Sequence, residues 1–267
     1  MQTPRSPTSL GREMTRSTLA IKELQKQLWI GRINLVLGKK ESGKTTLCLN
    51  LLRQIIEEKS IDKLLIVGNK DDYPSWATVY DSDNFDDVGK YVLDPENINI
   101  RKLLIIDSEN FYSNLFDKLF INNRSYNMTI IITRQIYSSL SSSLCRNIDY
   151  VFLLPETNLS TIQSWYNNFG GIISTFDMFK SALKSMNSSS PTSLVIKHSG
   201  ISCELTQNIF WTGMKLFDPN SLAPVDSIIP LNDSKKDVVT KKQIIQKINS
   251  IKAELDSIIN SLDDIAE

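Results

Sequence analysis

The sequence is poor in the residues that bind metals and in those that cross-link small domains. Its 267 residues include one histidine, His198, and three cysteines that lie far apart, Cys48, Cys145 and Cys203. Zinc sites need Cys and His ligands at short, regular spacings, so we expect no zinc. A hydrolase with a histidine base would depend on His198, whose polar neighbours favour a surface position. The separated cysteines fit a reducing compartment without disulfides.

Long apolar runs and an excess of one charge are also lacking. No run approaches the roughly 20 apolar residues of a membrane-spanning helix, so we expect no integral membrane protein. The polar N-terminus carries no visible secretory signal. Lys+Arg and Asp+Glu number 30 each, so no overall basic field points to nucleic acid.

The charges are nevertheless unevenly distributed along the chain. Residues 1–44 carry nine Lys or Arg against three Glu, and residues 71–96 carry eight Asp or Glu against one Lys. The acidic excess fits a solvated loop. The basic excess fits both a solvated tail and a face turned toward DNA phosphates, and the sequence leaves the two open.

The most informative segment matches a complete phosphate-binding loop. Residues 38–45, GKKESGKT, fit the pattern G-x-x-x-x-G-K-[ST] at every fixed position. An apolar run from Ile33 to Leu37 precedes the loop and predicts a buried strand. A helix with regularly spaced apolar residues is predicted to follow from Thr46 and to end near Lys59. This strand–loop–helix order is the context that the pattern requires.

The residue types in the loop explain the chemistry expected of it. Glycines let the backbone wrap around an anion, so that successive N–H groups and the helix N-terminus face the phosphates. Lys44 is expected to reach the β- and γ-phosphates, and the Thr45 hydroxyl is expected to ligate Mg²⁺. The sequence therefore predicts a site for ATP and Mg²⁺. The nucleotide cradle comprises Gly38, Lys39, Lys40, Glu41, Ser42, Gly43, Lys44, Thr45 and Thr46.

A second apolar run supplies a candidate carboxylate for the same site. The run from Lys102 to Ile106 ends in Asp107. Downstream of a complete phosphate loop, this is typical of the Walker B strand, whose terminal carboxylate orients the water shell of Mg²⁺. We therefore expect Asp107 to assist Thr45 at the metal.

Further apolar runs predict a mainly parallel sheet flanked by helices, the α/β fold of a P-loop NTPase domain. The helix between the first two strands makes a βαβ unit. Residues 69–97, rich in Asp, Asn and Pro with interleaved aromatics, are expected to be mostly loop. Additional strands are expected at 63–68, 128–133, 150–154, 194–197 and 208–211, and an edge position is open for the last. Helices are expected at 17–28, 115–121 and 156–185.

The ends of the chain differ in composition from this domain. We expect a flexible arm at 1–17, a P-loop domain at 18–217, a linker at 218–240 and an amphipathic helix at 241–267. In the last segment, apolar residues follow a 4-3-4-3-4-3 spacing over three heptads, which fits pairing with another chain and docking on the domain equally well. These residues are Ile244, Ile248, Ile251, Leu255, Ile258, Leu262 and Ile265.

The order of these pieces resembles the DNA-packaging ATPases of poxviruses and other large DNA viruses, within the FtsK/HerA group of ring-forming pumps. The resemblance covers roughly residues 30–217 and rests on GKKESGKTT, LLIIDSEN, and NNRSYNMTIIITRQIYSSL followed by NIDYVFLL. It implies a homo-oligomeric ring that hydrolyses ATP to move double-stranded DNA into a preformed capsid. It also implies capsid or other virion proteins as partners, and a location at the viral assembly site in the host cytoplasm or in the virion.

The resemblance also implies roles for individual residues. In that family an Arg lies just before the fourth strand and a Gln at its end, and Arg124 and Gln135 occupy these places here. Arg124 would act as an arginine finger on a neighbour's nucleotide, and Gln135 would sense the γ-phosphate. Thr133 and Arg134 fit ordinary strand-end residues.

One position departs from the family pattern and keeps alternatives open. The family usually has an acidic residue directly after the Walker B Asp, whereas here Ser108 stands there and the next carboxylate is Glu109. A strand-end bulge would let Glu109 polarise the attacking water. Otherwise hydrolysis is weak, and the protein is a nucleotide-binding structural or assembly component. A P-loop kinase is a further alternative, although no Arg-rich lid segment is visible.

Overall fold

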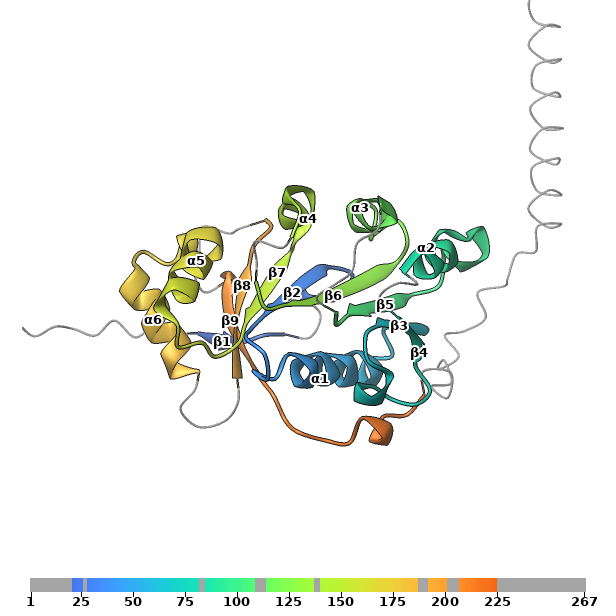
Figure 1. The fold of residues 1–267 in the computed structure, drawn as a ribbon, viewed down its shortest axis with the longest axis horizontal. Helices are drawn as coiled ribbons and strands as arrows, with labels where there is room; N and C mark the ends of the chain where they lie inside the picture. Colours follow the sequence, from blue (N-terminus) through green and yellow to red (C-terminus); the bar gives the residue numbers. More distant parts are fainter. Residues whose placement is uncertain are drawn as a thin grey trace, which may run out of the picture. The chain divides into compact units, whose positions relative to one another are not determined.

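Short apolar runs of the sequence become the strands of one large sheet. The computed structural model describes residues 21–25, 28–81, 85–108, 114–136, 140–186, 192–200 and 207–224. In these residues nine strands pair in the order β1-β9-β8-β7-β2-β6-β5-β3-β4. Figure 1 shows helix α1 on one face of the sheet and α2, α3 and α4 on the other.

Six neighbouring strands, from β7 to β4, are parallel. Strands buried on both faces need apolar side chains on both, which is why they are continuous apolar runs. Every residue of β2, β5, β6 and β7 is buried. The strands expected in this part of the sheet are confirmed, with ends shifted by about one residue. They are β2 (Ile33–Leu37), β3 (Lys63–Val67), β5 (Lys102–Ile106), β6 (Met128–Arg134) and β7 (Tyr150–Leu153). The edge strand β4 (Thr78–Tyr80) was not expected.

Three further strands extend the sheet beyond β7. Strands β8 (Thr192–Lys197) and β9 (Ile209–Gly213) pair antiparallel, and β1 (Lys22–Glu23) pairs parallel with β9. The expected helix at 17–28 is therefore wrong at Lys22–Glu23, and β9 is not an edge strand. The side of β9 that faces away from β8 pairs with β1, and the Leu24 N–H donates to the Trp211 carbonyl at 2.8 Å. Pairing in the sheet therefore overrides the local helical spacing.

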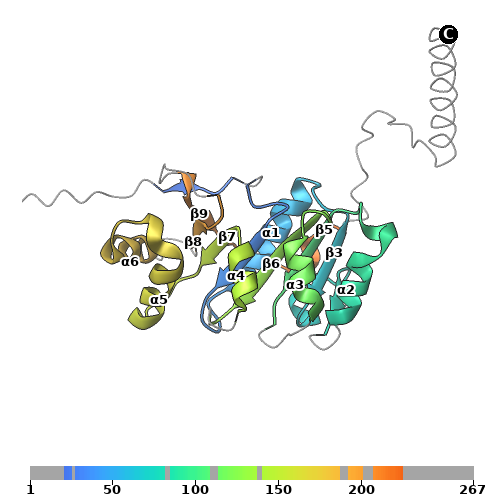
Figure 2. The same ribbon diagram turned by 90° about the horizontal axis from the view of Figure 1, so that it is seen from above.

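The helices divide the apolar core into two layers. Helix α1 (Lys44–Glu57) buries Leu47, Leu51 and Ile55 against one face of the sheet. The other face is covered by α2 (Phe85–Leu93), α3 (Asn114–Ile121) and the short α4 (Ser142–Asn147). Helices α5 (Leu159–Phe169) and α6 (Phe176–Ser185) lie at the β8 end, as Figure 2 also shows. The helix expected at 115–121 is confirmed, and the helical region expected at 156–185 is two helices separated by a 3-10 turn at Gly170–Ile172. Helix α4 was not expected.

The region expected to be mostly loop, residues 69–97, contains more regular structure than its composition suggests. Besides β4 and α2 it has 3-10 turns at Lys70–Asp72 and Pro95–Asn97. Helix α2 forms because Phe85, Val88 and Val92 recur at helical spacing and are fully buried. Its polar face carries the Asp residues that favoured a loop interpretation.

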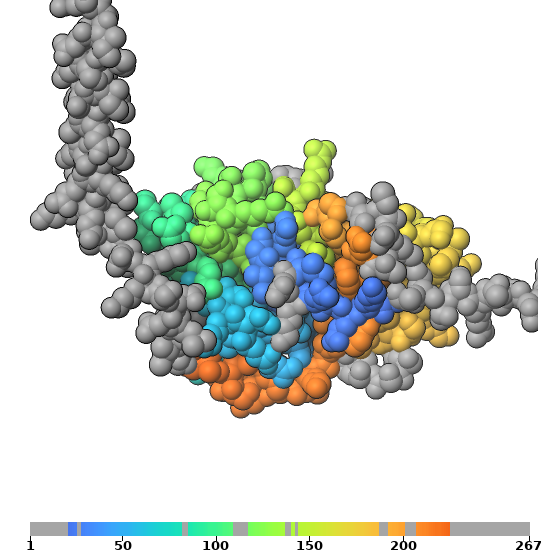
Figure 3. Space-filling model, turned by 180° about the vertical axis from the view of Figure 1, so that it is seen from behind, coloured from blue at the N-terminus to red at the C-terminus, as the bar shows by residue number. Residues whose placement is uncertain are grey.

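The chain after β9 returns along α1. Asn50 of α1 accepts a hydrogen bond from the Lys215 N–H at 3.0 Å and donates to the Lys215 carbonyl at 2.9 Å. Farther on, the Trp76 indole N–H donates to the Leu222 carbonyl at 2.9 Å. Figure 3 shows this returning segment in orange against the cyan α1. The first residues of the expected linker at 218–240 are therefore packed on the domain.

The predicted arm at 1–17, the rest of the linker from residue 225 and the predicted helix at 241–267 lie outside the described residues. In the described residues, no helix combines the length and the apolar character needed to cross a bilayer.

Asn50→Ala tests the attachment of the returning segment. Asn50 is 2% exposed, and its removal leaves the Lys215 N–H and carbonyl without that partner. We expect the free energy of unfolding to fall by roughly 1–3 kcal/mol, the cost of a buried polar group left unpaired. Urea denaturation measures this change. Asn168→Ala, which removes an exposed bond to the Ser164 carbonyl, is the control, and equal effects of both variants would contradict the attachment.

Candidate nucleotide site

The phosphate-loop residues lie between the carboxyl end of β2 and the start of α1, as predicted. A Cβ added at Gly38 would lie 2.3 Å from the Ser42 Oγ and 2.9 Å from the Leu154 Cβ. Gly43 has φ of 96°, in the left-handed region that disfavours a side chain. Each glycine is therefore required by the local backbone: the first by close approach, the second by conformation.

The interior of the loop is arranged for an anion. The Lys44 ammonium donates to the carbonyls of Gly38 and Lys39, both at 3.1 Å, so it points into the loop. Gly43 is the N-cap residue of α1 and has no side chain that could accept from the first N–H groups of the helix. Among the described residues, the buried Ser42 Oγ has no hydrogen-bond partner. A cation, an open helix N-terminus and an unpaired hydroxyl together suit phosphate oxygens.

Asp107 stands at the end of β5 and accepts hydrogen bonds from three hydroxyl groups. Thr45 donates to Oδ2 at 2.7 Å, and Tyr73 donates to the same oxygen at 2.9 Å. Thr133 donates to Oδ1 at 2.6 Å. These residues come from α1, from the segment between β3 and β4, and from β6. The predicted proximity of Thr45 and Asp107 is confirmed, whereas the two other contacts were not foreseen.

The donor set fits Mg²⁺. In the described residues, no group of three or more His, Cys, Asp and Glu side chains could hold a metal ion. A Mg²⁺ ion commonly takes one or two protein oxygens and completes its octahedron with water and substrate phosphates. The Thr45 hydroxyl and the Asp107 carboxylate beside a phosphate loop supply such oxygens.

Tyr73 and Cys48 are buried close to the Asp107 carboxylate. Burial, reinforced by the neighbouring Cys48 and Asp107, raises the pKa of the Tyr73 hydroxyl well above its ordinary value. Burial, followed by the charge of Asp107, likewise raises the pKa of the Cys48 thiol. Tyr73 therefore remains a neutral phenol that donates to Asp107, and Cys48 remains an unreactive thiol. In the sequence, Tyr73 was only one aromatic of a polar segment; no spacing indicated its partner.

The end of β6 enters the same site because β6 lies between β2 and β5. Arg134 is 3% exposed, and its Nη1 donates to the carbonyls of Ser108 and Thr133, both at 2.6 Å. Arg134 thereby ties the chain after Asp107 to β6. Gln135 follows it, half-buried, at the same edge of the sheet. Glu109 lies outside the described residues.

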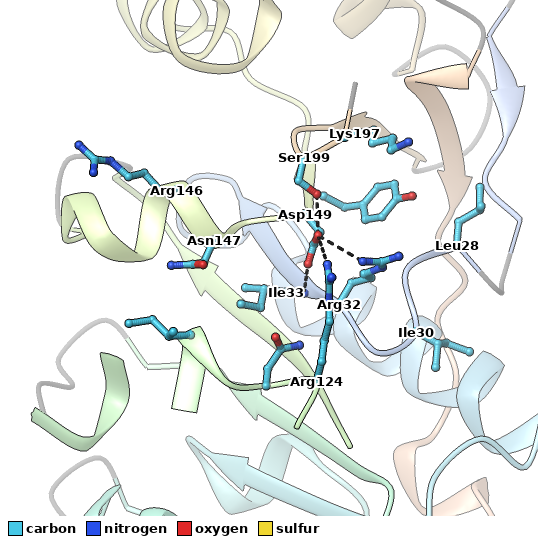
Figure 4. Close-up of a pocket in the computed structure, with 14 residues that line it drawn as sticks. Leu28, Ile30, Arg32, Ile33, Arg124, Arg146, Asn147, Asp149, Lys197 and Ser199 are labelled. Carbon is cyan, nitrogen blue, oxygen red and sulfur yellow. Dashed lines mark hydrogen bonds and ion pairs between the residues drawn. The ribbon is translucent and has the colours of Figure 1, made fainter. Parts of the chain in front are cut away.

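Arg124 lies just before β6, at the amino-terminal ends of the parallel strands and thus opposite the phosphate loop. It lines a pocket of 720 Å³. Its Nη2 is 3.3 Å from Oδ1 of Asp149, and its side chain is 65% exposed. The Arg32 Nη1 is 3.8 Å from the same oxygen. In Figure 4 both side chains converge on Asp149, whereas Arg146 points away. Lys197 adds a fourth cationic group to the lining of the pocket.

Asp149 organises this pocket and was not singled out in the sequence. It is 4% exposed and also accepts hydrogen bonds from the Ile33 N–H at 3.0 Å and the Ser199 hydroxyl at 2.5 Å. The only sequence signal was a carboxylate directly before the apolar run of β7. The five residues of β2 separate this edge from the phosphate loop by roughly 16 Å. Arg124 is therefore remote from the phosphate loop of its own chain.

Fold and loop together define a P-loop NTPase domain. Among solved structures, the chain is similar to the genome packaging NTPase B204 from Sulfolobus turreted icosahedral virus 2 in complex with ATP-gammaS. The TM-score is 0.51 at 15% identity, over 69% of this chain and 98% of that chain. The complex of the same NTPase with AMPPCP gives a TM-score of 0.50 at 16% identity, over 70% and 99% of the two chains. At this identity the likeness establishes the fold alone.

Two curated viral proteins are similar in sequence, and no protein-family model matches. Uncharacterized protein 075L of Invertebrate iridescent virus 6 is 26% identical over 165 residues, 54% of this chain and 62% of that protein. Uncharacterized protein 088R of Invertebrate iridescent virus 3 is 32% identical over 83 residues, 29% and 32% of the two chains. The chain thus spans less than two thirds of the length of either relative.

Lys44→Ala tests the phosphate loop. The Lys44 ammonium contacts only loop carbonyls in the described structure, so the fold and its thermal unfolding should change little. ATP turnover should fall by at least roughly 100-fold, the scale of losing one group that stabilises transition-state charge. Lys180→Ala, at an exposed position of α6 outside the phosphate loop, is the control and should keep near-normal turnover. A folded Lys44→Ala protein with normal turnover would contradict the assignment.

Proposed function

We propose that this protein is a genome-packaging ATPase of the FtsK/HerA group, of the type found in large DNA viruses, which couples ATP hydrolysis to translocation of double-stranded DNA into a capsid. The observation that carries the proposal is the phosphate loop beside a carboxylate held by three hydroxyls, on a sheet with β6 between β2 and β5. The structural likeness to a viral genome packaging NTPase and the sequence likeness to two iridescent virus proteins support the viral context.

In this proposal the carboxyl ends of the parallel strands bind the nucleotide, and the amino ends contact the nucleotide of a neighbouring subunit. At the carboxyl edge the loop amides and Lys44 bind the phosphates, while Thr45 and Asp107 hold Mg²⁺. When bound, Mg²⁺ neutralises charge on the phosphate oxygens. Gln135 contacts the γ-phosphate from the end of β6. Glu109 takes the role of the water-polarising carboxylate, in place of the acidic residue that the family usually has at the position of Ser108.

At the amino edge, Arg124 acts on the nucleotide of a neighbouring subunit in a homo-oligomeric ring. The support for this role is its exposed side chain and its remoteness from the phosphate loop of its own chain. A phosphoryl-transfer transition state spreads negative charge over the γ-phosphate oxygens, which a guanidinium fork can stabilise. Asp149 holds Arg124 toward the pocket until a phosphate replaces the carboxylate as its partner.

A second candidate is a nucleotide-binding assembly component with weak hydrolysis. Ser108 favours it, because the position directly after Asp107 carries no carboxylate. Both candidates bind ATP, and they differ in turnover and in the response to DNA.

Steady-state ATP turnover with and without double-stranded DNA distinguishes the two candidates. A packaging ATPase should turn over ATP on the order of once per second or faster, and DNA should raise that rate. The effect of DNA should weaken at high salt, because such pumps grip the phosphate backbone. ATP binding without measurable turnover, unaffected by DNA, would contradict the packaging role and favour the assembly component.

Mixing two inactive variants tests the action of Arg124 between subunits. Arg124→Ala alone should lower kcat by roughly 10³–10⁵-fold, the range for arginine fingers. Lys44→Ala has a defective pocket but an intact Arg124, so verified mixed oligomers of the two should recover part of the lost turnover. Arg101→Ala is the control, since Arg101 also precedes a strand at this edge but pairs with Asp62 at 2.6 Å. Mixed oligomers without recovered activity would contradict action between subunits.

A further inference from the structure

We propose that Tyr73 is a positioning residue of the nucleotide site, which orients Asp107 toward Mg²⁺ through its hydroxyl group. The inference rests on the proposed Mg²⁺-dependent binding of ATP and goes beyond it by assigning a function to a residue outside both the phosphate loop and β5. Tyr73 would not touch the nucleotide or the ion. It would act through the Asp107 Oδ2, to which it donates at 2.9 Å.

The hydrogen bonds to Asp107 leave little of the carboxylate free. A carboxylate offers about four acceptor positions. Thr45 and Tyr73 occupy two at Oδ2, and Thr133 occupies one at Oδ1. About one acceptor position therefore remains for the hydration shell of a cation, and the three hydroxyls determine the direction in which it points.

The three residues that donate these hydroxyl groups differ in their other roles at the site. Thr45 is itself an expected ligand of Mg²⁺, and Thr133 lies on β6, next to the strand that carries Asp107. Tyr73 approaches from the segment after β3 and has no other expected task in nucleotide binding. Its side chain is 2% exposed, so water cannot readily replace the hydroxyl as a donor to Oδ2.

The segment that carries Tyr73 is anchored on both sides. Before it, the Asn69 side chain accepts a hydrogen bond from the Asp71 N–H at 3.3 Å at the start of a 3-10 turn. After it, the Ser75 N–H donates to the Asn220 Oδ1 at 2.9 Å, and Trp76 contacts the Leu222 carbonyl. The returning segment after β9, which is far from the phosphate loop in sequence, therefore helps to hold the Tyr73 side chain in place.

The experiment compares the Tyr73→Phe variant with the wild-type protein, both full-length, by measuring ATP-gammaS binding as Mg²⁺ is titrated. The substitution deletes one oxygen and keeps the ring. The Mg²⁺ midpoint should rise by roughly 10–100-fold, the usual effect of removing a group that orients a metal ligand. Binding in EDTA should remain unchanged, because the loop amides and Lys44 are untouched. Tyr166→Phe is the matched control, since it removes the hydrogen bond that Tyr166 of α5 donates to the Ile173 carbonyl and should leave the midpoint unchanged.

The outcomes separate this inference from the proposed function. If the wild-type protein binds ATP-gammaS without any dependence on Mg²⁺, the proposed Mg²⁺ site fails. If the wild type depends on Mg²⁺ and Tyr73→Phe has the same midpoint, Tyr73 is only a packing residue and the inference is overturned. The midpoint is normalised to the nucleotide bound in EDTA, so a partly unfolded variant still gives a valid comparison, with circular dichroism reporting the folded fraction.

Discussion

The parallel pairing of β2, β6 and β5 is the constraint on which the site depends. Parallel strands end at the same edge, so this pairing brings the phosphate loop, Thr133 and Asp107 together although they are far apart in sequence. The register is as important as the order, because Asp107 meets Thr45 and Thr133 at hydrogen-bond distance. A sheet with the same strands in another order would separate these groups.

The same parallel arrangement also brings charged side chains together at the amino ends of the strands. At the amino ends of β2, β6 and β7, the Asp149 carboxylate collects Arg32, Arg124 and Ser199. Asp149 also accepts the Ile33 N–H and thereby contacts the start of the strand that carries the phosphate loop at its other end.

The expectations that failed did so where composition and packing disagree. The Asp-rich stretch around α2 resembled a loop, yet three apolar residues at helical spacing were enough to bury one face of a helix. The segment at Lys22–Glu23 had helical spacing, yet the edge of β9 offered backbone partners that a short isolated helix cannot match. In both cases a long-range contact outweighed a local tendency.

The sequence by itself determined the phosphate loop, the strands that carry it and Asp107, and the α/β class, because these follow from local patterns: fixed glycines, a lysine, and apolar runs bounded by polar residues. Tertiary structure alone decided that Tyr73 and Thr133 share Asp107 with Thr45, that Arg134 ties the chain after Asp107 to β6, and that Asp149 receives Arg124. The physical reason is that a hydrogen bond between distant residues depends on strand order and register, and neither leaves a periodic mark in the chain.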